Sequence, residues 1–211
     1  RPHPMIALTD ILSGASMNGL IYRSFQNYMT DSYGRDAWLQ VAARADISPP
    51  DFEAMLSYND ALASVVLDAM GDVLRRERGD LMEDVGAYLV SHPNTESVRR
   101  LLRFGGMNVA DFLHSLDDLP DRARMAVSDM HLPAIELHEH AAGSFSLICE
   151  TPLEGFGHLM MGVLRVMADD YGALALLELE RGSAGQDTVR IQLIETDYSH
   201  GRSFELGARA S

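Results

Sequence analysis

Three histidines that lie close together, His131, His138 and His140, carry the side chains best suited to binding a metal. His138 and His140 are two residues apart, so on a β-strand they leave the same face, as in some zinc sites. Glu136 could join them, but no further ligand is evident. A polar, solvated strand face explains this spacing better, and we predict no metal site.

The remaining reactive side chains form no recognisable catalytic pattern. The sequence has one cysteine, Cys149, and it contains no Gly-x-Ser-x-Gly motif, no phosphate-binding loop and no evident nucleophile–base pair. Nothing in the spacing of the carboxylates singles out a catalytic pair. We therefore predict that the chain is not an enzyme. A single cysteine also rules out an internal disulfide and fits a reducing compartment, which predicts a cytoplasmic location.

The charge balance excludes several classes of partner. The chain carries 31 acidic and 17 basic residues, a net charge of −14. Nucleic acids and anionic membranes both require a basic surface, so we expect neither as a partner. No apolar run is long enough to span a membrane, and the first residues do not resemble a secretory signal.

The hydrophobic pattern predicts an α+β fold. Six or seven helical segments precede residue 130, including "NDALASVVLDAMGDVLRRERG", which we expect to end at Gly79. The pattern then alternates, which predicts a small antiparallel sheet with a hairpin turn at Gly143 and one inserted helix, "GFGHLMMGVLRVMADDYG". We expect residues 1–16 to form an N-terminal extension and residues 17–206 to form one domain.

A proline interrupts the apolar stripe of one predicted helix. The stripe follows Phe112, Leu113, Leu116 and Leu119, and the position four residues after Leu116 is Pro120. Proline lacks an amide hydrogen and clashes with the preceding turn, at a cost of roughly 3 kcal/mol inside a helix. The helix should therefore kink or end near Leu119. Alternatively, Pro120 begins a new turn, with Asp117 or Asp118 as its cap.

Several fragments, taken in order, resemble the heme nitric oxide/oxygen binding (H-NOX) family. "MNGLIYRSFQNYM" resembles the family's opening, "DVGAYLV" its central helix, "GMNVADFLHSLDDL" the helix with the heme ligand, and "LPAIEL" the strand after it. The resemblance runs from Met17 to about Phe204. It implies a sensory domain that binds heme between helices and sheet and acts in signal transduction. Its partner would be a signalling protein such as a histidine kinase or a cyclic-dinucleotide enzyme.

The residues that hold heme in this family are mostly replaced. The family motif "LDxLH" is "LDDLP" here, so Pro120 stands at the position of the iron ligand. Thirteen residues later, Pro133 matches the family's proline that presses on the heme, so the register is kept. The family's Y-x-S-x-R motif, which grips the propionates, becomes Cys149, Thr151 and Leu153. The remaining pocket positions that the resemblance assigns are Ile21, Phe25 and Leu159, and Leu159 would form an apolar distal wall.

These replacements predict that heme is not bound in the family manner, and we expect no cofactor. Proline has no lone pair for iron, and leucine cannot pair with a buried carboxylate. An apolar small molecule or a tetrapyrrole remains an alternative ligand if the pocket is hollow, whereas methionine and leucine side chains could fill it. The alternative function is a true heme sensor of nitric oxide or oxygen with a different axial ligand, either Cys149 or His158.

Overall fold

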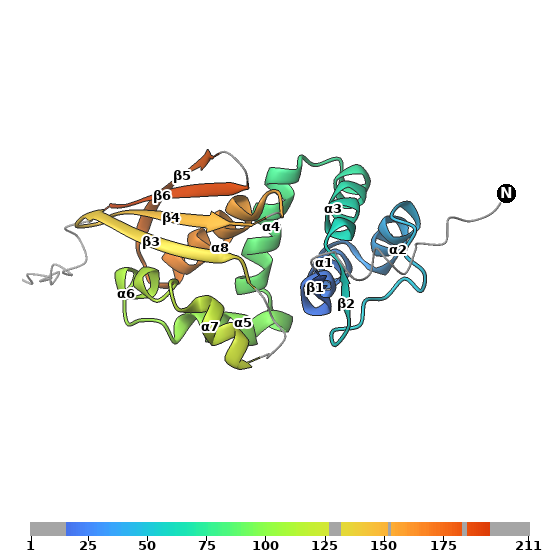
Figure 1. The fold of residues 1–211 in the computed structure, drawn as a ribbon, viewed down its shortest axis with the longest axis horizontal. Helices are drawn as coiled ribbons and strands as arrows, with labels where there is room; N and C mark the ends of the chain where they lie inside the picture. Colours follow the sequence, from blue (N-terminus) through green and yellow to red (C-terminus); the bar gives the residue numbers. More distant parts are fainter. Residues whose placement is uncertain (1–15, 127–131, 152, 183–184, 195–211) are drawn as a thin grey trace, which may run out of the picture.

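Two lobes meet along helix α4 in the computed structural model, which describes residues 16–126, 132–151, 153–182 and 185–194 (Figure 1). The first lobe consists of β1 (Ser16–Asn18), α1 (Gly19–Tyr33), α2 (Arg35–Arg44), β2 (Ser57–Asn59) and α3 (Ala61–Leu74). The second contains α4 (Arg78–Ser91), the short 3-10 helix η1 (Pro93–Thr95), α5 (Glu96–Arg103), α6 (Val109–His114), α7 (Leu119–Ala126), β3 (Ala134–Ala141), β4 (Ser144–Glu150), α8 (Phe156–Asp170), β5 (Leu174–Arg181) and β6 (Gln186–Ile194).

Aromatic packing forms the centre of the first lobe. The buried side chains of α1 recur at helical spacing, as Tyr22, Phe25 and Met29 show. The ring centroid of Phe52 lies 4.9 Å from that of Tyr22 and 5.8 Å from that of Trp38. Trp38, the only tryptophan, is fully buried on α2 and donates its Nε1–H to the carbonyl oxygen of Pro50 at 2.6 Å. These side chains belong to one apolar cluster that continues into the second lobe.

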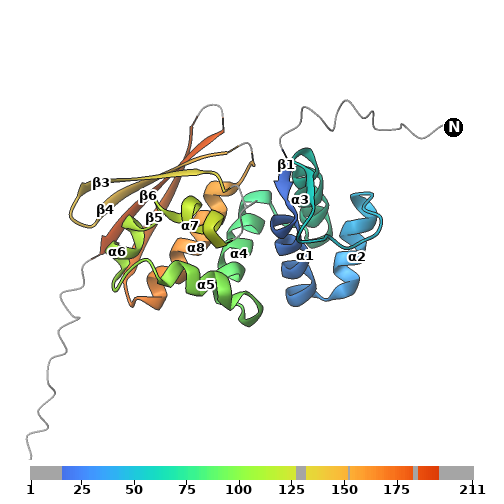
Figure 2. The ribbon, with the colours of Figure 1, turned by 60° about the horizontal axis from the view of Figure 1, so that its bottom comes forward.

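The sheet of the second lobe is antiparallel, with the strand order β3-β4-β6-β5. On β4 the side chains alternate, so that Phe145, Leu147 and Cys149 are buried on the inner face. Helix α8 packs against β5 and β6 on this inner face, and α7 packs against β3 (Figures 1 and 2). The opposite face carries polar side chains, such as His140 and Arg190, together with the exposed Leu174 and Leu176 of β5.

Helices α4 and α8 cross with their backbones in direct contact. A Cβ atom placed on Gly86 would lie 2.9 Å from the carbonyl carbon of Leu159, and closer still to its oxygen. A Cβ atom on Gly162 would lie 2.8 Å from the backbone nitrogen of Ala87 and closer to the oxygen of Glu83. Since 3.4 Å or more is an ordinary contact, only glycine fits at either position. The crossing joins α8 and the sheet firmly to α4.

The predicted α+β architecture is confirmed. Seven α-helices precede β3 in the described part of the chain, and α8 is inserted between the two hairpins of the sheet. Gly143 adopts a positive φ of 75° at the predicted turn. None of the described helices is long and apolar enough to cross a membrane. The predicted extension, residues 1–16, lies almost wholly outside the described residues, as does the end of the predicted domain beyond Ile194.

One predicted boundary is wrong. The helix expected to end at Gly79 already ends at Leu74, where Arg75 takes a left-handed conformation with φ 54°. Gly79 instead lies in the first turn of α4, and a Cβ atom there would be 2.8 Å from Nε2 of His158. This glycine therefore makes room for a side chain of α8 rather than ending a helix. The short β1–β2 pair was not predicted either.

Candidate functional site

Pro120 begins a new helix. Helix α6 ends at His114, a turn follows, and Pro120 is the second residue of α7. In a first helical turn the backbone N–H has no helical partner, so the missing amide hydrogen of proline removes no bond there. The first bond of α7 runs from the N–H of Arg122 to the carbonyl oxygen of Asp118, at 2.9 Å. Of the two outcomes expected from the sequence, this is the one in which Pro120 begins a new turn.

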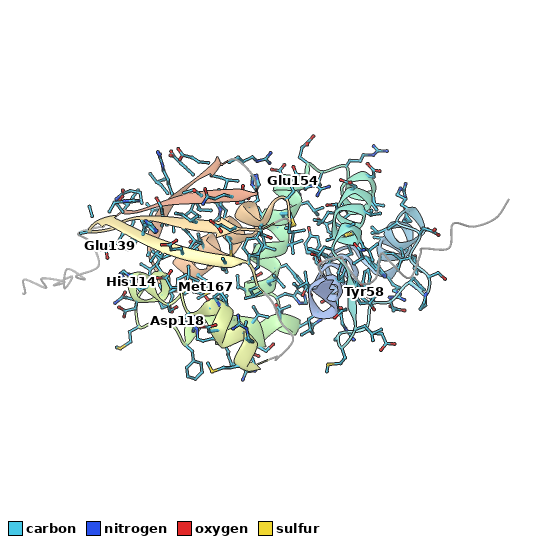
Figure 3. All side chains as sticks on the ribbon, viewed as in Figure 1. Tyr58, His114, Asp118, Glu139, Glu154 and Met167 are labelled. Atoms are coloured by element: carbon cyan, nitrogen blue, oxygen red, sulfur yellow. The ribbon has the colours of Figure 1, made fainter. Side chains whose placement is uncertain are left out.

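The turn before Pro120 is attached directly to the sheet. Oδ1 of Asp117 accepts a hydrogen bond from the N–H of Leu137 on β3 at 2.6 Å, so this side chain serves the sheet rather than capping α7. The His114 ring stands edge-on to that of Phe145 on β4, with 5.7 Å between centroids. Its Nε2 lies 3.2 Å from Oε2 of Glu139, a proximity that Figure 3 shows. The end of α6 is thus held against β3 and β4.

Arg122 fixes the position of α7. Its Nη2 donates to the carbonyl oxygen of Ser115 at 2.8 Å, and its Nη1 donates to that of Leu101 at 3.2 Å. These bonds satisfy carbonyl groups at the ends of α6 and α5, which have no partner within their own helices. Because one side chain joins three helices, the segment that carries Pro120 has a defined geometry.

Cys149 lies inside the sheet and holds its proton. It is fully buried on β4, opposite Ile135 of β3 and Asp187 of β6 in the strand register. Burial, with a smaller contribution from the charge of Asp187, raises the pKa of the thiol to about 12. The thiolate, which is the form that ligates metals, is therefore scarce at neutral pH.

Three further candidate residues lie at the end of β4. Oγ1 of Thr151 accepts a hydrogen bond from the N–H of Leu153 at 3.0 Å, so its hydroxyl shapes the local turn. Leu153 is buried in the apolar core. Ala134 pairs with Glu150, which places the half-buried Pro133 beside this end of the strand. The structure thus groups Pro133 and the three replaced residues of the propionate motif.

The other candidate residues come from α8 and α1. On α8, Leu159 is half-buried against the core, and His158 directs its ring toward Gly79 of α4. On α1, Phe25 is fully buried and Ile21 is half-buried. Figures 1 and 2 both place α4 between α1 and the strands β3 and β4. The α1 residues and the end of β4 therefore belong to different sides of α4.

Two surface hollows lie away from all of these positions. One, of about 540 Å³, lies on the outer face of the sheet and is lined by residues that include His140, Leu176 and Arg190. The other, of about 660 Å³, lies at the turn between α3 and α4 and includes Arg75. Neither is lined by a candidate heme residue.

The comparison with protein families shows to which family the chain belongs. The family described as Haem-NO-binding matches residues 18–176, which is most of the chain. The chain belongs to the Haem-NO-binding family. The match ends within β5, so it includes α1 and the whole segment from α4 to α8 that carries the candidate residues.

Curated relatives of this Haem-NO-binding chain are much longer proteins. It is 26% identical over 155 residues to soluble guanylate cyclase gcy-34 of Caenorhabditis elegans, a match that covers 72% of this chain and 23% of the relative. It is 22% identical over 160 residues to soluble guanylate cyclase 89Da of Drosophila melanogaster, covering 76% and 24%. The chain therefore spans about a quarter of the length of these relatives.

Solved structures share the fold. An Fe(II) unliganded H-NOX protein from K. algicida superimposes with a TM-score of 0.74 at 17% sequence identity, covering 86% of this chain and 99% of the other. An H-NOX protein from S. oneidensis in the Fe(II)NO ligation state gives a TM-score of 0.71 at 14% identity, covering 85% and 100%. At these identities the similarity establishes the Haem-NO-binding fold.

The side chains at the heme positions of this family member do not fit the group. Pro120 offers no atom that can ligate iron, and Leu153 offers no donor for a propionate. Cys149 is buried and protonated, and among the residues of the propionate motif only the Thr151 hydroxyl, which accepts a hydrogen bond from the N–H of Leu153, keeps an O–H that could donate to a propionate. These positions therefore supply neither an iron ligand nor a charged partner for the propionates.

The histidines on β3 have other partners. Nε2 of His138 lies 2.8 Å from Oε1 of Glu136, and Nε2 of His140 lies 2.8 Å from Oγ of Ser146. The described residues contain no group of three or more ligating side chains that could hold a metal ion. His131 lies outside the described residues.

Sequence reasoning missed the residues that connect these positions to the rest of the fold. The sequence singles out neither Arg122 nor Asp187, and it suggests Asp117 only as a helix cap, because each of the three acts on a residue distant in the sequence. A weak signal exists for Gly79 and Gly86, because glycine is unfavourable inside a helix and often marks close packing.

Proposed function

We propose that this chain is a sensory or regulatory domain that has lost the family's mode of heme binding and acts through contacts with a signalling protein. A histidine kinase or a cyclic-dinucleotide enzyme is the kind of partner that the family resemblance suggests. The observation that carries the proposal is the position of Pro120, which lies in the first turn of α7 where the family resemblance places the iron ligand. The domain itself has no catalytic role in this proposal.

The loss of the propionate clamp supports the same conclusion independently. Heme would bring two carboxylates to the end of β4, where the family motif has an arginine and this chain has buried Leu153. A carboxylate buried without a charged or hydrogen-bonding partner is strongly unfavourable. Restoring only an iron ligand would therefore leave the propionates unpaired.

A heme sensor with a different axial ligand has weaker support. Cys149 would have to lose a proton from a thiol whose pKa is about 12. The ring of His158 on α8 lies against Gly79 of α4, so it would have to move away from Gly79 to reach a bound ligand. We keep this function as the outcome that would overturn the proposal.

Spectroscopy with hemin tests the proposal directly. Purified protein should show no Soret band beyond that of free hemin after reconstitution, and its reduced form should show no shift with nitric oxide. The H-NOX protein from S. oneidensis, treated in the same way, is the positive control. A wild-type Soret band that shifts with nitric oxide, and that disappears in Cys149→Ala or His158→Ala, would establish the alternative.

Restoring the family residues provides the matched gain of function. Pro120→His should recover some iron affinity, and adding Leu153→Arg and Cys149→Tyr should increase it, provided that the pocket persists. Because Cys149→Tyr enlarges a fully buried side chain, circular dichroism must first show that each variant folds. A folded triple variant that still rejects hemin would mean that side chains fill the pocket.

A further inference from the structure

The loop between α5 and α6 presents two large apolar side chains to water. In the sequence Phe104-Gly105-Gly106-Met107, the side chains of Phe104 and Met107 are 89% and 94% exposed. The loop lies in the lower part of the second lobe, on the side away from the first lobe (Figure 2). Such exposure places both side chains among the most accessible apolar groups of the molecule.

The loop is held in place by packing against α6. A Cβ atom on Gly105 would lie 2.6 Å from Cβ of Ser115, and one on Gly106 would lie 2.5 Å from the backbone nitrogen of Phe112. The Tyr171 hydroxyl donates to the carbonyl oxygen of Gly106 at 3.0 Å. Both glycines therefore face inward, and the backbone that carries the exposed Phe104 and Met107 is packed against α6 and bonded to Tyr171.

Two cations share this surface. Arg100 and Phe104 are four residues apart on the helical backbone of α5, which Phe104 continues, and Arg103 directly precedes Phe104, whereas Met107 follows in the non-helical loop after Gly105 and Gly106. Arg100 faces Glu96 across 3.7 Å, with both side chains mostly exposed, which is a weak pairing. The Arg103 guanidinium lies 5.5 Å from the ring centroid of Tyr171. We call these four residues the α5–α6 knob.

We propose that the α5–α6 knob docks into an apolar recess on a partner protein, and that carboxylates border this recess. The apolar pair supplies the anchor and the two arginines supply the charge complementarity. An anionic membrane would match the arginines, but it presents an extended negative surface to a chain of net charge −14, whereas carboxylates at the edge of a recess place their charge only beside the arginines, and salt screens them from more distant acidic residues. A second copy would have to offer a different surface, and such head-to-tail contacts continue into open filaments unless they close. The inference rests on the proposed action through protein contacts.

Selection from a random peptide library displayed on phage tests the knob. The full chain serves as bait, with counter-selection on the Phe104→Ser/Met107→Ser variant. We expect enriched peptides that combine large apolar residues with aspartate or glutamate. A synthetic peptide of the enriched sequence should bind the double variant at least about thirtyfold more weakly, as expected when anchor residues are lost.

Two further variants separate the knob from general surface effects. Arg100→Glu/Arg103→Glu should select basic peptides in place of acidic ones. Leu174→Ser/Leu176→Ser removes two other exposed apolar side chains, on β5, and should leave affinity unchanged. Because all of these side chains are exposed, each variant should keep the circular dichroism spectrum of the wild type.

The proposal is wrong if no enriched peptide depends on Phe104 and Met107, or if the wild type selects basic peptides. It is also wrong if the dependence appears instead in binding to phosphatidylcholine–phosphatidylserine vesicles, or in self-association measured by sedimentation equilibrium. Peptide binding by the knob and hemin binding are measured independently. A negative result for the knob can therefore be told apart from evidence that the chain binds heme.

Discussion

Replacing Gly86 with alanine should force α4 away from α8. The new Cβ atom would lie 2.9 Å from the carbonyl carbon of Leu159, whereas ordinary contacts begin at 3.4 Å. The backbones must therefore separate by at least about 0.5 Å, and by more to clear the nearer carbonyl oxygen. Since the opposing atoms are backbone, no rotamer change relieves the overlap. The buried Val85 and Val163 would lose part of their packing.

Two opposing effects set the expected size of the loss. Overpacking a tight interface costs typically 1–3 kcal/mol, and a backbone neighbour favours the upper end of about 3 kcal/mol. Alanine recovers about 1 kcal/mol through its better helix propensity. We expect the free energy of unfolding to fall by about 2 kcal/mol, which for a slope of about 2 kcal/mol/M lowers the urea midpoint by about 1 M.

Urea unfolding followed by circular dichroism measures this change. Gly71→Ala in α3 is the matched control, because the nearest atom to its new Cβ, the carbonyl oxygen of Arg76, is 3.0 Å away and only a slight adjustment is needed. We expect that control to stay within about 1 kcal/mol of the wild type. If Gly86→Ala is as stable as Gly71→Ala, the close crossing of α4 and α8 does not exist as described.

Two further predictions concern side chains that tie distant segments together. Asp117→Ala removes the acceptor for the N–H of Leu137, so hydrogen exchange at that amide should accelerate and stability should fall by about 1 kcal/mol; Asp118→Ala, whose side chain makes no hydrogen bond among the described residues, should change neither. The Tyr88 hydroxyl donates to Oδ2 of Asp31 at 2.6 Å and holds the pKa of that carboxyl below its usual value. A lowered pKa contributes stability above the unfolded value of about 3.9 that is lost as the pH falls through the folded value. Tyr88→Phe should therefore weaken the acid-induced loss of stability in urea titrations, and an unchanged pH profile would contradict this assignment.

Local patterns were enough to predict the architecture. The change from helical to alternating spacing near residue 130 is a property of neighbouring residues, and so is the turn chemistry of Gly143. The conformational limits of proline predicted either a kink or helix end near Leu119 or a new turn at Pro120, and the structure has the new turn. The end of α3 was missed because Gly79 looks like a helix terminator, whereas its role depends on His158, which lies far along the chain.

The candidate site was predictable only in part, for the same reason. The spacing from Pro120 to Cys149 and Leu153 identifies which family positions are replaced. The protonated state of Cys149 depends first on its burial in the sheet and to a smaller extent on Asp187, and neither the burial nor the register of β4 with β6 can be predicted from one strand alone. The hydrogen bond that Asp117 accepts from the N–H of Leu137 on β3 likewise joins residues distant in the sequence, so the sequence alone did not predict it.

The single tryptophan and the single cysteine provide an internal pair of probes. Trp38 is fully buried in the first lobe, and Cys149 is fully buried in the sheet of the second. Indole fluorescence therefore follows the melting of one half of the molecule, and thiol labelling follows the opening of the other, with no engineered reporter. Coincident denaturation curves from the two signals would mean that the halves come apart as one cooperative unit.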